Sequence, residues 1–339
     1  MEKIFFLLIL FFTFACVSTS PESGLVEKVS IEALQNETFN AEFKLEKELL
    51  TTDSYKSSLV SYSSDGLKVF ALINKPVTVA PEKGYPVLIF GHGFHPTPKE
   101  YGVSSSTGKD WRPGDYYRGI PETFARNGYL VVTPDYRGHN ASEGFDFTKK
   151  SFLASSFYAR DVLSLISGLN SLPDADMDNI FFMGHSMGGD VGLKVLLAND
   201  QINAASLWAP MVSSTYQQAL YYGKYYDQEN DKVDVDVMQS YLDKIEEIYT
   251  SLPMPVKYAD VDPIEHINEL STPVIIHHAR NETAVPYIWS ESLVAKLHQL
   301  NKEYELYTYD SANHLFKDEN LKLAFERDLA FFKKYQAQY

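Results

Sequence analysis

A serine stands between two glycines in the pentapeptide Gly184-His185-Ser186-Met187-Gly188. A serine hydroxyl attacks a carbonyl carbon when a neighbouring base takes its proton, so this pattern points to acyl transfer. The apolar residues 180–183 precede the pentapeptide and a helix-like segment follows it. A strand that reverses sharply into a helix strains the backbone at the serine, and Gly184 and Gly188 remove side chains that would collide there. We therefore expect a nucleophile elbow with Ser186 at its tip.

Two later loops offer the base and the acid that such a serine needs. Glu282 lies just past an apolar run that ends at His277 and His278, and His314 lies just past the last predicted strand. Serine, acid and histidine follow one another in the order expected for this kind of elbow. We expect His314 to take the proton from Ser186, and Glu282 to orient the imidazole. The alternatives are a loop histidine without a role and a solvated surface carboxylate.

The attacked carbonyl oxygen gains negative charge and needs hydrogen-bond donors that are already in place. The backbone N–H of Met187, the residue after the serine, is the first expected donor. A second donor should come from the loop that follows the predicted strand at residues 87–90. Both donors would be backbone groups of the oxyanion hole.

Short apolar runs and helical stretches alternate along most of the chain. A hairpin is expected first, because two period-two segments flank Ser64-Asp65-Gly66. The further predicted strands are residues 87–90, 129–133, 180–183, 205–208, 274–277 and 304–309. The predicted helices are residues 117–127, 151–169, 187–198, 288–300 and 321–335. Because these strands are apolar without alternation, we expect a doubly wound α/β domain with a mostly parallel, eight-stranded sheet and an antiparallel N-terminal edge.

One segment, at about residues 211–264, interrupts this alternation. It contains no predicted strand, and seven of its tyrosines stand among acidic residues: Tyr216, Tyr221, Tyr222, Tyr225, Tyr226, Tyr241 and Tyr249. Ligands of open α/β sheets bind beyond the carboxyl ends of the strands, and the insertion leaves the strand that ends at Trp208. We expect a helical lid that shapes a substrate pocket; the alternative is a peripheral decoration whose tyrosines only pack.

Four blocks of sequence together carry a family resemblance. They are His92-Gly93, then Asp135-Tyr136-Arg137-Gly138-His139 with Ser142-Glu143-Gly144, the elbow, and the loops of Glu282 and His314. From residue 55 to its end the chain resembles the α/β-hydrolase superfamily, in the esterase and prolyl-oligopeptidase-like (dienelactone-hydrolase-like) branch. The resemblance implies serine hydrolase activity without a cofactor or metal, and it places the second oxyanion donor at the backbone N–H of Phe94.

The acid loop departs from the family pattern H-G-x-x-D-x-x-V-P. Ala279 replaces the glycine, and Glu282 replaces the aspartate. A glutamate can orient a histidine too, but its extra methylene moves the carboxylate. We also expect no metal site, because the pairs His92 with His95 and His277 with His278 have no second pair at ligand spacing.

The N-terminus is typical of an exported protein. Met1-Glu2-Lys3 leads into a largely apolar run that ends before Cys16, the single cysteine. The run is shorter than the ~20 residues that span a membrane, so residues 1–20 are expected to be a signal. A cysteine at this position resembles the cleavage site of bacterial lipoproteins, where it becomes lipidated. A lipid anchor would hold the protein on a membrane, facing the periplasm or the cell exterior; ordinary cleavage would leave it secreted.

Composition limits the remaining possibilities. The 339 residues are 45% apolar and carry a net charge of −15, which makes nucleic acid an improbable partner. Residues 21–50 are expected to be a tether or lead-in, and residues 51–339 the hydrolase domain. We expect cleavage of a small carboxylic ester, because the stretch before residue 55 is too short for the β-propeller of the oligopeptidases. The alternatives are a small aminopeptidase or amidase, and a binding lipoprotein with a degenerate triad.

Overall fold

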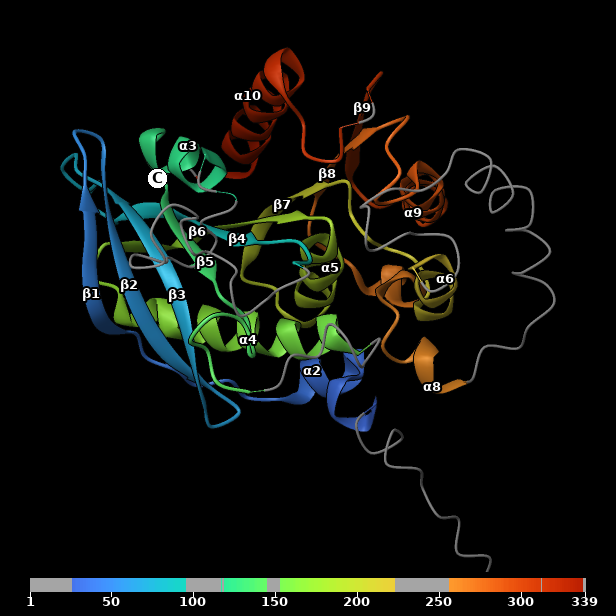
Figure 1. Ribbon diagram of the computed structural model, residues 1–339, viewed down its shortest axis with the longest axis horizontal. Helices are drawn as coiled ribbons and strands as arrows, with labels where there is room; N and C mark the ends of the chain where they lie inside the picture. Colours follow the sequence, from blue (N-terminus) through green and yellow to red (C-terminus); the bar gives the residue numbers. More distant parts are fainter. Residues whose placement is uncertain are drawn as a thin grey trace, which may run out of the picture.

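In the computed structural model of the protein, the described residues are 26–95, 117, 119–144, 153–222, 256–311 and 313–337. Within these ranges the strands form one nine-stranded sheet in the order β1-β2-β3-β5-β4-β6-β7-β8-β9 (Figure 1). The strands are β1 Lys44–Thr51, β2 Tyr55–Ser64, β3 Leu67–Pro76, β4 Tyr85–Gly91, β5 Leu130–Pro134, β6 Ala175–His185, β7 Ile202–Trp208, β8 Val274–Ala279 and β9 Tyr304–Tyr309.

The direction of the strands divides the sheet into two parts. Strands β1, β2 and β3 pair antiparallel, and β3 joins β5 antiparallel. From β5 to β9 all pairs are parallel. The predicted α/β fold with an antiparallel N-terminal edge is confirmed, and the described sheet has one strand more than the eight expected.

Helices cover both faces of the sheet. On one face α4 (Ala154–Gly168), α5 (Met187–Ala198) and α9 (Tyr287–Gln299) enclose the larger apolar core. On the other face α3 (Gly119–Arg126) and α10 (Asp318–Tyr335) enclose a core rich in aromatic residues, and Figure 1 shows these two helices together above the strands. Asp328 of α10 joins that helix to the sheet, because it accepts hydrogen bonds from Ser206 and Trp208 and contacts His277.

From residue 26 the segment before β2 packs against the rest of the domain, so the described part of the predicted tether or lead-in at residues 21–50 is not a free tether. Helix α2 (Ile31–Asn36) buries Ile31 and Leu34 in the larger core, and Gln35 donates to the carbonyl of Leu197. Strand β1 pairs with β2 although its side chains are mostly exposed. An edge strand that is exposed to solvent on both faces has no apolar pattern in its sequence, which explains why β1 was not predicted.

Both ends of the insertion are helical where they are described. Helix α6 (Thr215–Leu220) begins it, and α8 (Val256–Ala259) with the 3₁₀ helix η5 (Pro263–Glu269) returns the chain to β8. Residues 223–255 lie outside the described residues, and so do four of the seven tyrosines. The expected signal with Cys16 also lies outside them. In the ranges that are described, no helix is both long and apolar enough to cross a membrane.

Candidate active site

The nucleophile elbow forms between β6 and α5. Ser186 lies between the last residue of β6 and the first residue of α5, and its backbone has φ 57° and ψ −121°. A positive φ is strained for a serine, and such strain is characteristic of functional sites. Three backbone hydrogen bonds hold it: the N–H of Ser186 donates to the carbonyl of Trp208, and its own carbonyl accepts from Gly189 and Met211.

The two glycines of the elbow are required by close packing of the backbone. A Cβ on Gly184 would lie 2.3 Å from the carbonyl oxygen of Gly188. A Cβ on Gly188 would lie 2.1 Å from the carbonyl oxygen of Gly91, at the end of β4. Both distances are too short for a real side chain, so these glycines let the elbow fold tightly against β4.

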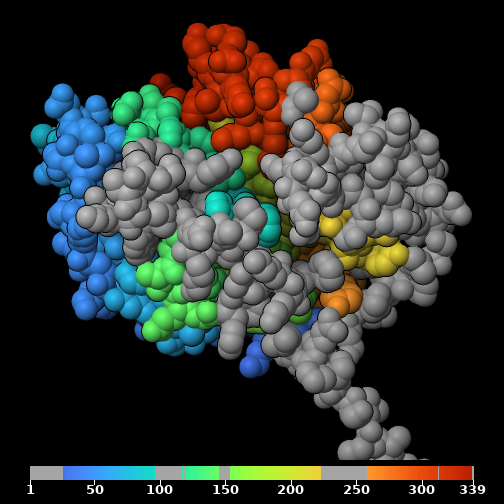
Figure 2. Space-filling model, viewed as in Figure 1, coloured from blue at the N-terminus to red at the C-terminus, as the bar shows by residue number. Residues whose placement is uncertain are grey.

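The loop after β4 runs directly beside the nucleophile. A Cβ on Gly93 would lie 3.2 Å from the Cβ of Ser186, and Nδ1 of His92 donates to the carbonyl of Gly93 at 2.8 Å. The next residue, Phe94, is 46% exposed, whereas Met187 is buried at the start of α5. In Figure 2 the end of β4 and the residues after it, coloured cyan, lie at the centre of the visible face. The expected oxyanion residues thus lie on the two segments that flank Ser186.

The structure brings Glu282 and His314 together. Glu282 follows β8, His314 lies between β9 and α10, and these parallel strands end at the same edge of the sheet. Nδ1 of His314 lies 3.2 Å from Oε2 of Glu282, close enough for an ion pair once the imidazole takes up a proton but without the alignment of a hydrogen bond. The Glu282 side chain is fully buried and that of His314 is 26% exposed. An imidazole held on one side and open on the other is suited to proton transfer.

The Glu282 carboxylate is held on both oxygens. Oε2 accepts from the backbone N–H groups of Ala284 and Val285, and Oε1 accepts from Nε2 of His278 at 2.8 Å. Burial raises the pKa of Glu282, but the nearby His314 and the hydrogen bond from His278 outweigh it and lower the pKa to about 2. Glu282 is therefore ionised at neutral pH.

The insertion contacts the acid loop. The hydroxyl of Tyr221 donates to the carbonyl of Thr283, and that of Tyr222 donates to the carbonyl of Ala284 at 3.0 Å. Both tyrosine rings also pack edge-on against Trp289 of α9. These two tyrosines therefore link the insertion to the backbone beside Glu282.

Sequence reasoning missed four contacts at this site, those of His185, Tyr117, His278 and the pair Tyr221–Tyr222. His185 belongs to the elbow motif itself, and the centroid of its ring lies 4.4 Å from the ring centroid of His314. The hydroxyl of Tyr117 lies 2.7 Å from Nδ1 of His185. Tyr117 and His185 are 68 positions apart, and no pattern in the sequence indicates that their side chains meet. The only signal was that both residue types can form hydrogen bonds.

The Asp135-Tyr136-Arg137 block supports the fold beside the site. Arg137 is buried and makes several hydrogen bonds to Asp161 of α4, and it also donates to Asp65 at the β2–β3 turn. Arg160 binds the same Asp65. This network fixes the antiparallel edge of the sheet to α4, so the role of the block is structural.

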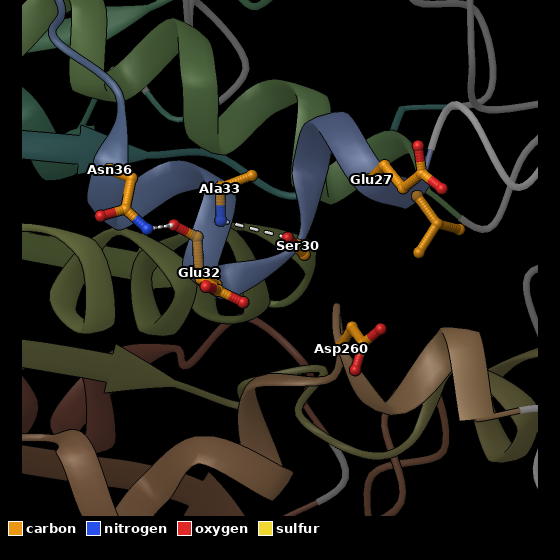
Figure 3. Close-up of a pocket in the computed structure, with 7 residues that line it drawn as sticks. Glu27, Ser30, Glu32, Ala33, Asn36 and Asp260 are labelled. Carbon is orange, nitrogen blue, oxygen red and sulfur yellow. Dashed lines mark hydrogen bonds between the residues drawn. The ribbon is translucent and has the colours of Figure 1, made fainter.

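One pocket of the described surface lies away from the expected catalytic residues. A pocket between α2 and the end of α8 has three carboxylates among its lining residues, and Figure 3 shows Glu27 and Glu32 on one side of it and Asp260 on the other. It includes neither Ser186 nor His314. Within the described ranges, no three His, Cys, Asp or Glu side chains are grouped so that they would hold a metal ion.

Comparisons with known proteins show which family the chain belongs to. The model of the "Prolyl oligopeptidase family" matches residues 116–338. A protein of Bacillus subtilis (strain 168), named "Uncharacterized peptidase YtmA", is 25% identical over 262 residues, which are 76% of this chain and 85% of the relative.

Solved structures share the fold at low sequence identity. Pyrococcus horikoshii acylaminoacyl peptidase has a TM-score of 0.62 at 18% identity over 84% of this chain, which spans only 42% of that longer chain. Acetyl xylan esterase 1 from Thermoanaerobacterium sp. JW/SL YS485 has a TM-score of 0.60 at 15% identity and covers 94% of both chains. A dienelactone hydrolase-like structure from Klebsiella pneumoniae gives 0.54 at 16% identity, over 82% of this chain and 99% of that one. These matches show the α/β-hydrolase fold.

Proposed function

Because the chain belongs to the prolyl oligopeptidase family, we propose that it is a serine hydrolase that cleaves carboxylic esters through an acyl-enzyme on Ser186. The observation that carries the proposal is the convergence of three elements at one edge of the sheet. Ser186 is at the tip of the strained elbow, and the ring of His314 has its Nδ1 at 3.2 Å from the ionised Glu282.

The proposed mechanism follows from these positions. Nδ1 of His314 faces Glu282, so Nε2 on the opposite side of the ring takes the proton from Ser186. Oγ of Ser186 bonds to the ester carbonyl carbon, and the backbone N–H groups of Phe94 and Met187 stabilise the oxyanion. The C–O bond to the alcohol then breaks, and the alcohol leaves with the proton from His314. Water repeats the sequence and releases the acid.

Esters are the favoured substrates on two grounds. An alkoxide leaves more readily than an amide nitrogen, so a serine activated by this triad cleaves an ester more easily than a peptide bond. Two acetyl xylan esterases are similar in fold to this chain over nearly all of their own lengths, at 94% and 96% of their chains. A peptidase or amidase is the second candidate, because the family description and the name of the Bacillus subtilis relative both refer to peptidases.

A fluorophosphonate probe tests the nucleophile. We expect covalent labelling of the wild type and no labelling of Ser186→Ala, because the probe reacts with an activated serine. Ser213→Ala, at a buried serine in the loop after β7, is the matched control and should be labelled like the wild type. Well-folded wild type that resists labelling would contradict the proposal and favour the binding lipoprotein.

A substrate panel separates the two hydrolase candidates. Aryl acetates and longer acyl esters are compared with aminoacyl and dipeptidyl anilides through kcat/KM. We expect higher kcat/KM for the esters. A preference for anilides by more than about tenfold, that is about 1.4 kcal/mol of transition-state stabilisation, would replace the ester proposal with the peptidase.

We also propose that the protein is exported and anchored by a lipid on Cys16. The support is the order of charged, apolar and small residues in the first 16 positions. In a bacterial host, labelled palmitate should enter the wild type and not Cys16→Ser. Cleavage without lipid incorporation into the wild type would instead indicate a secreted protein.

A further inference from the structure

His185, the residue directly before the nucleophile, connects two catalytic loops through its side chain. It is the last residue of β6 and is 2% exposed. Nδ1 of its ring lies 2.7 Å from the hydroxyl of Tyr117, and Nε2 lies 3.1 Å from the backbone carbonyl oxygen of His314. We propose that His185, oriented by Tyr117, is a positioning residue that holds the main chain of His314 for proton transfer with Ser186. This inference rests on the proposed function.

The partners of His185 fix where its proton lies. A carbonyl oxygen only accepts hydrogen bonds, so Nε2 must carry the proton that reaches His314. Nδ1 then has a free electron pair and accepts from the O–H of Tyr117. Replacing the tyrosine with phenylalanine would therefore leave Nδ1 buried without its donor.

His185 is neutral while it donates to the carbonyl of His314. Burial and the neighbouring His314 lower its pKa to about 3, so it carries no charge at neutral pH. A cation 4.4 Å from the ring of His314 would oppose the imidazolium that forms during catalysis. A neutral ring holds the loop without that penalty.

The Tyr117–His185 pair also borders the oxyanion loop. A Cβ on Gly93 would lie 2.6 Å from the hydroxyl of Tyr117 and 3.4 Å from Nδ1 of His185. The ring of Tyr117 packs edge-on against Phe90 of β4 at 5.4 Å. The buried Tyr117–His185 pair thus lies beside Gly93, in the loop that leads to Phe94. Through His185, which directly precedes Ser186, it also contacts the main chain of His314.

His314 needs a second point of attachment. Its Nδ1 meets Glu282 off the hydrogen-bond direction, and its side chain is partly exposed. Glu282 thus holds the ring, and His185 holds the backbone to which the ring is attached. A shift of about 1 Å in such a group lowers catalysis on the order of 100-fold.

Three variants test the role. His185→Leu removes the donor, His185→Gln keeps an N–H near the position of Nε2, and Tyr117→Phe removes only the hydroxyl that orients the ring. On the best ester we expect His185→Leu to lower kcat by about 10- to 100-fold with KM within about threefold. His185→Gln should recover most of kcat, and Tyr117→Phe should lie between. Equal loss in the leucine and glutamine variants would overturn the proposal.

A double-mutant cycle separates positioning of His314 from general structural damage. If His185 acts through His314, adding His185→Leu to His314→Ala should slow fluorophosphonate labelling no further. If the same factor is lost in both backgrounds, His185 acts elsewhere and the inference fails.

Hydrogen exchange gives a readout that does not depend on activity. His185→Leu should speed exchange in residues 313–317 without speeding it in β6 or β7. Unchanged exchange there would refute the positioning contact even in an active enzyme. Failure of the wild type to react with the probe, together with faster exchange in the variant, would refute the proposed function and leave the contact standing.

Discussion

The buried carboxylate of Asp262 should make the protein less stable as the pH rises. Asp262 is 1% exposed and closes the base of the insertion: its Oδ1 accepts from the backbone N–H of Thr215 at 2.8 Å and from the Thr215 hydroxyl. Its Oδ2 is buried without a hydrogen-bond partner among the described residues. Replacing Asp262 with Asn keeps an oxygen for Thr215 and removes the charge.

The size of the effect follows from the pKa of Asp262. Burial raises it from 3.8 to about 6, although the hydrogen bonds from Thr215 act in the opposite direction. Between these values the folded protein holds a proton that the unfolded chain has lost, so stability falls as pH rises. A difference of about 2 in pKa corresponds to about 3 kcal/mol at about 1.4 kcal/mol each. The loss should be complete above about pH 7.

Urea unfolding at pH 4, 5, 6, 7 and 8 measures this directly. The unfolding free energy of Asp262→Asn minus that of the wild type should rise by about 2 kcal/mol from pH 4 to pH 7, because part of the loss occurs below pH 4, and then stay level. Asp260→Asn, at an exposed aspartate two residues earlier, serves as the control for removing one negative charge. A difference that does not change with pH, or that falls, would refute the assignment of a buried, destabilising carboxylate.

Three further predictions concern the acid loop and the core. Glu282→Gln should lower kcat on the order of 10⁴-fold by presenting the wrong group to His314, and Glu282→Asp should fall between it and the wild type in steady-state assays. Tyr222→Phe, which loses the hydrogen bond to Ala284, should reduce stability by about 1 kcal/mol in urea and lower kcat more than Tyr216→Phe. Asp328→Asn should cost about 3 kcal/mol of unfolding free energy, because the contact with His277 is fully buried; a cost below about 1 kcal/mol would contradict this.

Much of the fold was predictable because parallel strands that are buried on both faces leave continuous apolar runs. Residues 180–183 and 274–277 are such runs, and they lie in β6 and β8. Strand β1 was not predictable, because an exposed edge strand is held by backbone pairing that leaves no side-chain pattern. Helix α2 was missed because only Ile31 and Leu34 anchor it in the core.

At the site, residue types and their order predicted that Glu282 and His314 lie side by side, and their side chains are 3.2 Å apart. The contacts around this pair could not be foreseen. Ser186, Glu282 and His314 each belong to a local motif that follows a strand. His278 and His185 act through hydrogen bonds whose partners depend on side-chain direction and on tertiary packing. A spacing along the chain carries no information on which nitrogen of an imidazole meets which oxygen.

The position of β4 matters to anyone who shortens this protein. The family model matches from residue 116, after β4 has ended at Gly91. In space β4 lies between β5 and β6, and seven residue pairs join it to β6 from Tyr85↔Ala175 to Gly91↔Gly184. A truncated gene product that starts at residue 116 would leave two interior strands facing a gap. The smallest unit to express therefore starts upstream of α2, well before the first residue that the family model matches.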